Sequence, residues 1–215
     1  MDIDAMRRGA EAPVIAGPGD LTAVAADLAD AFTDDVMFDW FFRADAKRPE
    51  AYRRFFRLVV TLGAGQGARI ERPAAGGGAA IWLPFEAAGP MSLRDELRAF
   101  PTLLFATGLA RLGRLMAVRA DMDAHHPMDR PHAYLWFLGV ARAAQGHGVG
   151  SRLLKVATDR LDAEGRAAYL ETQTERNLYL YRRHGFEVIS EHRPRADSPM
   201  LWSMWRDPLV EQAGA

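Results

Sequence analysis

The chain has 215 residues, of which 49% are hydrophobic, enough to bury one good core, so we expect one domain. Its formal net charge is −1 and its 27 basic residues are scattered, which argues against a nucleic-acid or membrane partner. It contains no cysteine, which excludes disulfides, thiolate metal sites and a cysteine nucleophile.

The first segment, residues 1–12, is acidic and lacks an apolar core. It is therefore not a secretory signal, and we expect it to be flexible and the protein to be cytoplasmic. The longest apolar run, residues 100–118, has Arg111 and Arg114 at its centre. A bilayer would penalise each of these charges by about 2.5–3.5 kcal/mol, so this run is better explained as an amphipathic helix.

The first third of the chain predicts a strand and two helices. A short strand at 13–17 precedes apolar residues at helical spacing over 20–33, where Asp20 could cap the helix. A second helix is predicted over 48–64. The segment between them, DDVMFDWFF (34–42), concentrates aromatic and acidic residues and is either a pocket wall or packing between two helices.

The middle of the chain predicts a hairpin over 68–85, where two extended runs flank a glycine cluster. A helical region over 92–120 follows, interrupted at Pro101. Residues 132–140, HAYLWFLGV, are short, aromatic and apolar, which is typical of a strand buried on both faces.

The last third alternates helices and strands. A helix follows Gly148 and ends near Gly165. The remaining elements are expected to be a strand, a short helix and two closing strands, at 167–172, 175–184, 186–192 and 200–206.

The glycine-rich stretch 139–154, GVARAAQGHGVGSRLL, lies between a predicted strand and a predicted helix. Glycines there would let successive backbone N–H groups approach a diphosphate, aided by the positive end of the helix dipole. A Walker A loop is excluded because its lysine is missing. A dinucleotide fold fits less well, since ARAAQ separates the strand from Gly146. Tight packing alone is the other alternative.

The pattern Gln145-x-x-Gly148-x-Gly150 resembles the pyrophosphate loop of the GNAT superfamily of coenzyme A-dependent N-acyltransferases. Residues 169–192, YLETQTERNLYLYRRHGFEVISEH, resemble the later portion of that superfamily, with matches at Asn177, Tyr181, Gly185 and Phe186. The chain is similar in particular to the puromycin N-acetyltransferase-like branch, well over 125–206 and loosely over 18–90.

The resemblance implies a single α/β (α+β) domain over 13–208. Its mixed central sheet of about six to seven strands would be flanked by helices, and two parallel strands, 132–140 and 167–171, would splay apart. Residues 13–124 would form the acceptor side and 125–208 the acetyl-CoA-binding part, with a flexible tail at 209–215. A monomer or a homodimer is expected.

The resemblance also implies the residues that bind acetyl-CoA. The pantetheine arm would pair with the backbone of strand 132–140, the pyrophosphate would lie on the glycine loop, and two side chains of the short helix at 175–184 would face the donor. Asn177 could instead be a simple helix N-cap. The expected cofactor-binding residues are Leu138, Gly139, Val140, Gln145, Gly146, His147, Gly148, Val149, Gly150, Ser151, Asn177 and Tyr181.

Tyr181 matches the family's general acid, because a phenol is protonated at neutral pH and can donate to a leaving thiolate. Glu171 is the first candidate for the base, or else it satisfies nearby backbone N–H groups. Asp34, Asp35 and Glu86 are weaker candidates for the base, or they could bind a cationic acceptor. His125 and His126 fit a solvated helix end, and no metal is required. Aromatic residues could line an acceptor pocket or all be core: Phe38, Trp40, Phe41, Trp82 and Trp202.

The resemblance therefore predicts an acetyl-CoA-dependent N-acetyltransferase that acts on a primary amine of a small molecule by direct attack on the thioester. Two alternatives stay open: a non-catalytic coenzyme A-binding regulatory module, and an NAD(P)-binding protein.

Overall fold

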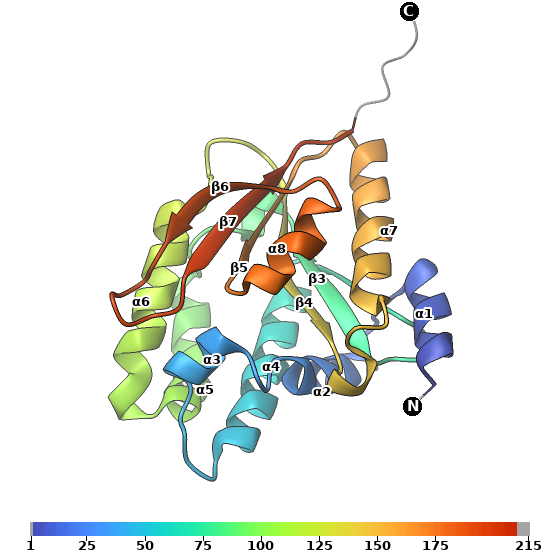
Figure 1. The fold of residues 1–215 in the computed structure, drawn as a ribbon. Coiled ribbons are helices and arrows are strands. Elements are labelled where there is room, and N and C mark those ends of the chain that lie inside the picture. The colour runs from blue at the N-terminus through green and yellow to red at the C-terminus, as the bar shows by residue number, and fades with distance from the viewer. Residues whose placement is uncertain (1, 210–215) are drawn as a thin grey trace, which may run out of the picture.

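The computed structural model describes residues 2–209, and these residues form one seven-stranded sheet in the order β1-β2-β3-β4-β5-β7-β6 (Figure 1). The α/β architecture with a mixed sheet is thus confirmed. Of the tail expected at 209–215, only Leu209 lies within the described residues. The strands are β1 (Val14–Ile15), β2 (Arg69–Arg72), β3 (Gly78–Leu83), β4 (Ala133–Val140), β5 (Ala168–Thr172), β6 (Glu187–His192) and β7 (Leu201–Arg206).

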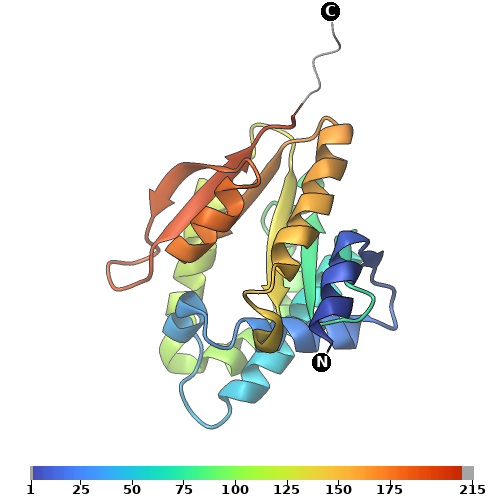
Figure 2. The same ribbon diagram turned by 45° about the vertical axis from the view of Figure 1, so that its right-hand side comes forward.

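Helices cover both faces of the sheet (Figures 1 and 2). On β3, Ile81 packs with the core beneath α2 to α6, whereas Ala80 and Trp82 pack with residues of α7 and α8 on the other face. This division follows from the alternation of side chains along a strand. The helices are α1 (Ile3–Glu11), α2 (Leu21–Ala31), α3 (Val36–Phe41), α4 (Arg48–Gly65), α5 (Leu93–Thr107), α6 (Leu109–His125), α7 (Val149–Ala163) and α8 (Glu175–Arg182), with the 3₁₀ turns η1 (Phe85–Ala87) and η2 (Arg142–Ala144).

One strand pair is parallel, and it separates along its length. Strands β4 and β5 pair only through Ala133 with Ala168 and Tyr134 with Tyr169. Every other neighbouring pair in the sheet is antiparallel. The splayed parallel pair that the resemblance implied is therefore present, and it leaves the rest of the β4 edge without a strand partner on the β5 side.

The N-terminal segment was expected to be flexible, and this is wrong for residues 3–11. They form α1, which begins where the Asp2 carboxylate accepts a hydrogen bond from Ala5 N at 2.9 Å. Met6 and Ala10 are buried in a small apolar cluster with Leu153 of α7. The apolar contact is non-local, so the acidic character of the segment gave no signal of it.

The helix break predicted at Pro101 occurs instead at Gly108. Helix α5 continues through Pro101, and α6 begins after Gly108, whose φ is +65°. Proline removes one backbone donor, and the carbonyl that loses it belongs to Leu97, a residue that is 68% exposed and can therefore be solvated. The left-handed backbone at Gly108 ends the helix because it favours glycine.

Residues 34–42 are not extended: 36–41 form the short helix α3, capped by Asp35. Its rings join an aromatic cluster with α2 and α4, in which Phe38 lies 5.4 Å from Phe32 and 5.6 Å from Phe56 between ring centroids. The cluster also contacts Phe137 of β4 through Phe32 and Phe56, so it holds α3 next to the part of β4 that does not pair with β5. Within the described residues, no helix is both long and apolar enough to cross a membrane.

Candidate functional site

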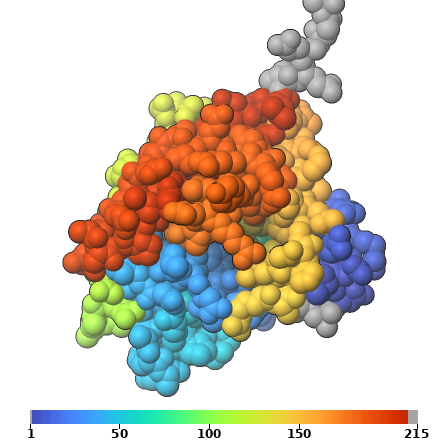
Figure 3. Space-filling model, viewed as in Figure 1, coloured from blue at the N-terminus to red at the C-terminus, as the bar shows by residue number. Residues whose placement is uncertain are grey.

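A cavity of about 250 Å³ lies where β4 and β5 separate. Its walls come from α3, α4, α5 and α6 on one side and from β4, β5 and α8 on the other. Figure 3 shows a hollow on the surface where α8 (orange), the 141–148 loop (yellow) and the segment around α3 (blue) meet. The residues that line the cavity and bear on the chemistry are Leu138, Glu171, Asn177, Tyr181, His126 and Asp123.

The backbone of β4 forms one edge of this gap. Leu138, Gly139 and Val140 pair with β3 on one side, while β5 has already diverged on the other. An added Cβ at Gly139 would lie 2.7 Å from a methyl carbon of Leu28, so glycine is needed there for the close approach of α2. The edge can therefore accept an extended ligand as an additional strand would pair with it.

The glycine loop joins β4 to α7. Gly146 and Gly148 have φ values of +79° and +80°, and Gly148 is the N-cap of α7. The first N–H groups of a helix have no acceptor within it. The N–H groups of Val149, Gly150 and Ser151 are the first ones of the 15-residue helix α7. The dipole of this helix favours an anion at its N-terminus.

Several side chains of the loop are committed to holding it in place. The Gln145 amide donates to Val140 O at 3.0 Å and to Ala31 O at 3.3 Å. The Ser151 hydroxyl lies 2.8 Å from His184 Nε2, and His147 Nδ1 lies 2.9 Å from Gln145 O. Backbone N–H groups are thus the main donors that this loop offers to an anion.

Tyr181 and Asn177 lie four residues apart on α8 and both line the cavity, as expected for positions on one helix face. Tyr181 is 6% exposed, whereas Tyr179 is 70% exposed and points away. Burial, together with the charge of Asp35, raises the pKa of the Tyr181 phenol. Its hydroxyl makes no hydrogen bond within residues 2–209. The N-cap of α8 is Thr174, so the alternative role of Asn177 as N-cap is wrong.

Glu171 projects from β5 into the same cavity, and its side chain is 4% exposed. Its Oε1 has no hydrogen-bond partner among the described residues, and no described backbone N–H donates to its side chain. Burial, followed by the charge of the Glu171 carboxylate beside them, raises the pKa of the Tyr134 and Tyr169 phenols. A buried oxygen without a partner costs about 1–3 kcal/mol, which indicates a ligand site.

Of the five aromatic residues predicted for the acceptor pocket, Phe38 and Phe41 line the cavity, and both are also part of the core. Trp82 is 2% exposed in the core with α7 and α8. Trp202 packs on that core from β7, and Trp40 donates to Asp197 at 3.4 Å. None of the three tryptophans reaches the cavity, so their placement in an acceptor pocket is wrong.

The three weaker acid candidates also lie outside the cavity lining. Asp35 caps α3 by accepting from Met37 N and Phe38 N, and it accepts from the Gln173 amide. Burial raises the pKa of its carboxyl group. Glu86 is exposed on η1, and Asp34 is exposed beside Arg142 at 3.6 Å. Asp35 therefore acts as a cap in this fold.

The histidines of HHPMDRPH were not recognised as site residues. His126 is not a solvated helix end: its side chain is 6% exposed and lines the cavity. Its Nε2 lies 3.0 Å from His132 Nε2. The sequence contained one signal of this contact. His132 directly precedes β4, and β4 pairs with β5 from Ala168 onward, three residues before Glu171.

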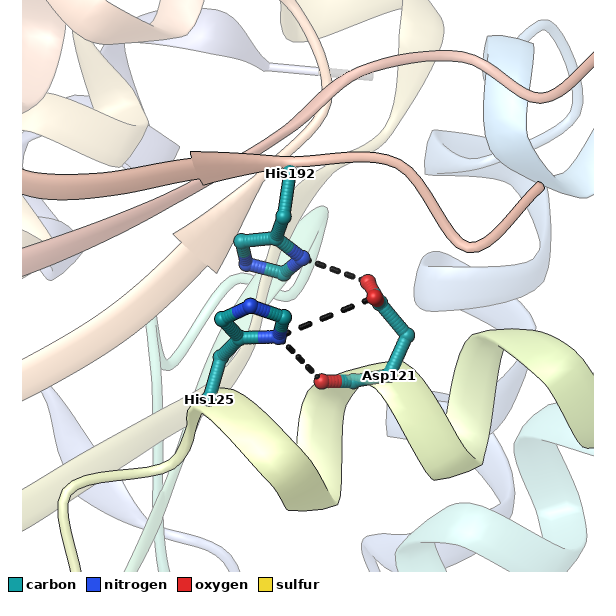
Figure 4. Close-up of side chains that lie close together, drawn as sticks. All are labelled: Asp121, His125 and His192. Carbon is teal, nitrogen blue, oxygen red and sulfur yellow. Dashed lines mark hydrogen bonds and ion pairs between the residues drawn. The ribbon is translucent and has the colours of Figure 1, made fainter. Parts of the chain in front are cut away.

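A second cluster lies behind the site, where Asp121, His125 and His192 place one ligand atom each within 4.8 Å of one another (Figure 4). The two imidazole rings stack at 3.8 Å with an interplanar angle of 8°. A metal bound through ring nitrogens lies near each ring plane, which two stacked parallel rings cannot both satisfy. His192 Nδ1 instead binds the Asp121 carboxylate at 2.5 Å.

Comparison with known proteins gives consistent matches. The Acetyltransferase (GNAT) family model matches residues 84–186. N-alpha-acetyltransferase RimI of Mycobacterium tuberculosis is 31% identical over 126 residues, which cover 57% of this chain and 70% of that protein.

Solved structures extend the match to nearly the whole chain. A histone acetyltransferase HPA2 and related acetyltransferase from Corynebacterium glutamicum has a TM-score of 0.67 and 25% identity, over 93% of this chain and 97% of that one. Arylalkylamine N-acetyltransferase 2 from Aedes aegypti shares the fold, with a TM-score of 0.60 and 10% identity over 91% and 97% of the two chains. The chain thus belongs to the GNAT acetyltransferase family, whose members use acetyl-CoA, and it is an N-acetyltransferase.

Proposed function

We propose that this protein transfers an acetyl group from acetyl-CoA to the primary amine of a small molecule with an apolar body. The observation that carries this proposal is the mostly apolar cavity with Glu171 in its wall, where Oε1 of the carboxylate has no hydrogen-bond partner among the described residues. An apolar body would fill the space between α5 and α6, where Leu103, Leu115 and Val118 line it. The ammonium group would then face Glu171.

The residues fit acetyl-CoA at two places. The free edge of β4 at Leu138 to Val140 would pair with the pantetheine arm, and one of its N–H groups would polarise the thioester carbonyl. The N–H groups from Gly146 to Ser151 would hold the pyrophosphate. Gly148 has a φ of +80°, a left-handed conformation that favours glycine and that exposes the backbone of this turn.

Two residues would manage the protons. An alkyl ammonium must lose a proton before its nitrogen can attack, and Glu171 would accept that proton. The nitrogen then forms a bond to the acetyl carbon as the carbon–sulfur bond breaks, and Tyr181 gives the departing sulfur a proton. Because burial raises the pKa of Tyr181, this phenol stays protonated and available at neutral pH. The donor supplies the activated acetyl carbonyl.

A library of primary amines assayed by the release of free coenzyme A thiol would test this proposal. We expect turnover with at least one arylalkyl or alkyl amine and less with polar amines of the same size. Peptides with free N-termini belong in the library, because the relative named above is an N-alpha-acetyltransferase. Turnover of peptides alone would overturn the small-molecule proposal.

Binding would separate the alternatives. We expect acetyl-CoA, and not NADH, to raise the melting temperature. Stabilisation by NADH alone would indicate an NAD(P)-binding protein. Stabilisation by acetyl-CoA without turnover of any amine or peptide would indicate a non-catalytic coenzyme A-binding module.

A further inference from the structure

Two acceptor atoms from different elements face each other in the cavity wall. His126, the first residue after α6, places Nδ1 3.8 Å from Oε1 of Glu171 on β5. Both side chains are more than nine-tenths buried, and both line the cavity. The imidazole ring is held between Tyr134 and Tyr169, at centroid distances of 4.8 and 4.6 Å.

His132 determines which nitrogen of His126 carries the hydrogen. His132 Nδ1 lies 2.9 Å from the carbonyl oxygen of Arg130, which can only accept, so Nδ1 carries the hydrogen. Burial lowers the pKa of His132, so the ring is neutral at pH 7 and Nε2 has a lone pair. His126 Nε2, 3.0 Å away, must then donate to it. In its neutral form, the His126 ring held in this tautomer presents a bare lone pair at Nδ1.

A carboxylate oxygen and a bare imidazole nitrogen at this separation cannot bond to each other, because neither has a hydrogen. A donor placed between them can reach both at about 2.9 Å. A primary ammonium has three N–H groups in a compact head, whereas an alcohol has one donor and a quaternary ammonium has none.

We propose that His126 and Glu171 together bind the ammonium group of the acceptor and take its proton, with His132 as the positioning residue that fixes the tautomer of His126. This proposal rests on the proposed function. It names the groups that bind the primary ammonium of the acceptor, and it gives a role to histidines that the family resemblance did not assign.

The proton balance is complete without a further reactant. The ammonium nitrogen loses two protons in all. The His126–Glu171 pair takes the first proton, and this frees the nitrogen lone pair. The pair later releases that proton to solvent. The second leaves the nitrogen once the carbon–nitrogen bond has formed, and it restores the Tyr181 phenolate that has given its own proton to sulfur.

Other charged and titratable groups around His126 bear on its pH response. Asp123 of α6 and Arg119 one turn before it line the same cavity. Tyr134, Tyr169 and His132 contact the ring, and burial keeps all three neutral at pH 7. Of the acidic groups, Glu171 faces Nδ1 directly, with Oε1 at 3.8 Å.

Binding of benzylammonium by titration calorimetry, without donor, tests the pair directly. His126→Gln keeps an amide donor within reach of His132 but has no acceptor at the Nδ1 position, so we expect about tenfold weaker binding. His126→Asn keeps a carbonyl near that position and should bind nearly as the wild type does. The control is His125→Gln, because this neighbour stacks on His192 outside the cavity lining, and it should change nothing.

Rates then separate binding from proton transfer. With an amine identified by thiol release, His126→Asn should lower kcat about 10²-fold at pH 7. The deficit should shrink as the pH approaches the pKa of the amine, because free amine needs no base. His132→Leu should lower kcat, and His132→Gln should restore much of it through a carbonyl that accepts from His126.

The outcomes are distinct from those of the proposed function. If benzylammonium does not bind the wild type, or binds the wild type and His126→Gln equally, the pair is overturned even if amines are acetylated. If binding depends on His126 and no amine is acetylated, the pair stands and the proposed function fails.

Discussion

Replacing Tyr181 by phenylalanine removes one oxygen atom and tests the general acid directly. The phenol ring is 6% exposed and packs edge-on against Phe186 at 5.9 Å, so phenylalanine can occupy the same space. The hydroxyl has no hydrogen-bond partner within the described chain, so its removal leaves no other group unpaired, and the free energy of unfolding should change by less than about 1 kcal/mol.

The expected loss is in the chemical step. Proton donation to a leaving group contributes about 10²-fold or more to the rate, and at about 1.4 kcal/mol per factor of ten this equals about 2.7 kcal/mol of transition-state stabilisation. We expect Tyr181→Phe to lower kcat by about 10²-fold, while the Kd of acetyl-CoA changes little. Steady-state thiol release and titration calorimetry would measure the two quantities.

The pH profile adds a sign to this prediction. Burial and the charge of Asp35 raise the pKa of Tyr181 above its ordinary value near 10. The acid form therefore persists through neutral pH, and ionisation of Tyr181 should not reduce kcat below pH 10. Tyr179→Phe, on the same helix and 70% exposed, is the matched control. Wild-type turnover in Tyr181→Phe, or an equal loss in Tyr179→Phe, would refute the assignment.

Two further predictions concern the donor loop and the fold. Gly148→Glu should weaken acetyl-CoA binding by about 10³-fold, because a carboxylate about 4 Å from a phosphate costs about 4 kcal/mol at an effective dielectric constant of 20. Gly165→Glu, at the other end of α7 and also at positive φ, should leave the Kd unchanged; equal Kd values for both variants would contradict a phosphate at Gly148. Asp162 accepts two hydrogen bonds from the buried Arg206, of 2.7 and 2.6 Å. Asp162→Asn should therefore lower the free energy of unfolding by about 3 kcal/mol. The control Asp159→Asn, on the exposed face of the same helix, should lower it by less than about 1 kcal/mol. Arg206 lowers the pKa of Asp162. The stability that this ion pair contributes is therefore fully present above the ordinary aspartate pKa and is lost as the pH falls through the lowered pKa. Melting temperatures measured over an acid pH series would detect this loss.

Periodicity and turn residues were sufficient to predict most of the elements. Residues 20–33, 48–64 and 132–140 became α2, α4 and β4 with boundaries shifted by at most two residues. These segments have strong apolar patterns and clear end signals, so local sequence determines their boundaries. By contrast, α1 depends on packing against α7, a contact between residues more than 100 positions apart, and no local pattern reports such a contact.

Only the part of the candidate site that lies in one continuous segment could be predicted, because the rest is brought together by contacts that are distant in sequence. Glu171, Asn177 and Tyr181 lie in one continuous motif, and the cavity brings their side chains together. The tryptophans were assigned to an acceptor pocket by residue type alone, and Trp82 is core because its position on β3 faces α7 and α8. His126 reaches Glu171 only through the path of the chain from α6 to β4, which periodicity does not encode.

The polar groups behind Glu171 explain how its carboxylate stays available. The Tyr169 hydroxyl could donate to Glu171, but it donates to Ser203 Oγ at 2.9 Å. Ser203 in turn contacts His192 Nε2 at 3.0 Å, and His192 is held by Asp121. Because a phenol has one hydrogen, this chain of contacts keeps the Tyr169 donor from Glu171, just as His132 turns the His126 donor away. Oε1 of Glu171 thus receives no hydrogen bond from Tyr169 or His126, while the Tyr134 phenol also stands beside the carboxylate, and an unpaired buried acceptor lowers stability.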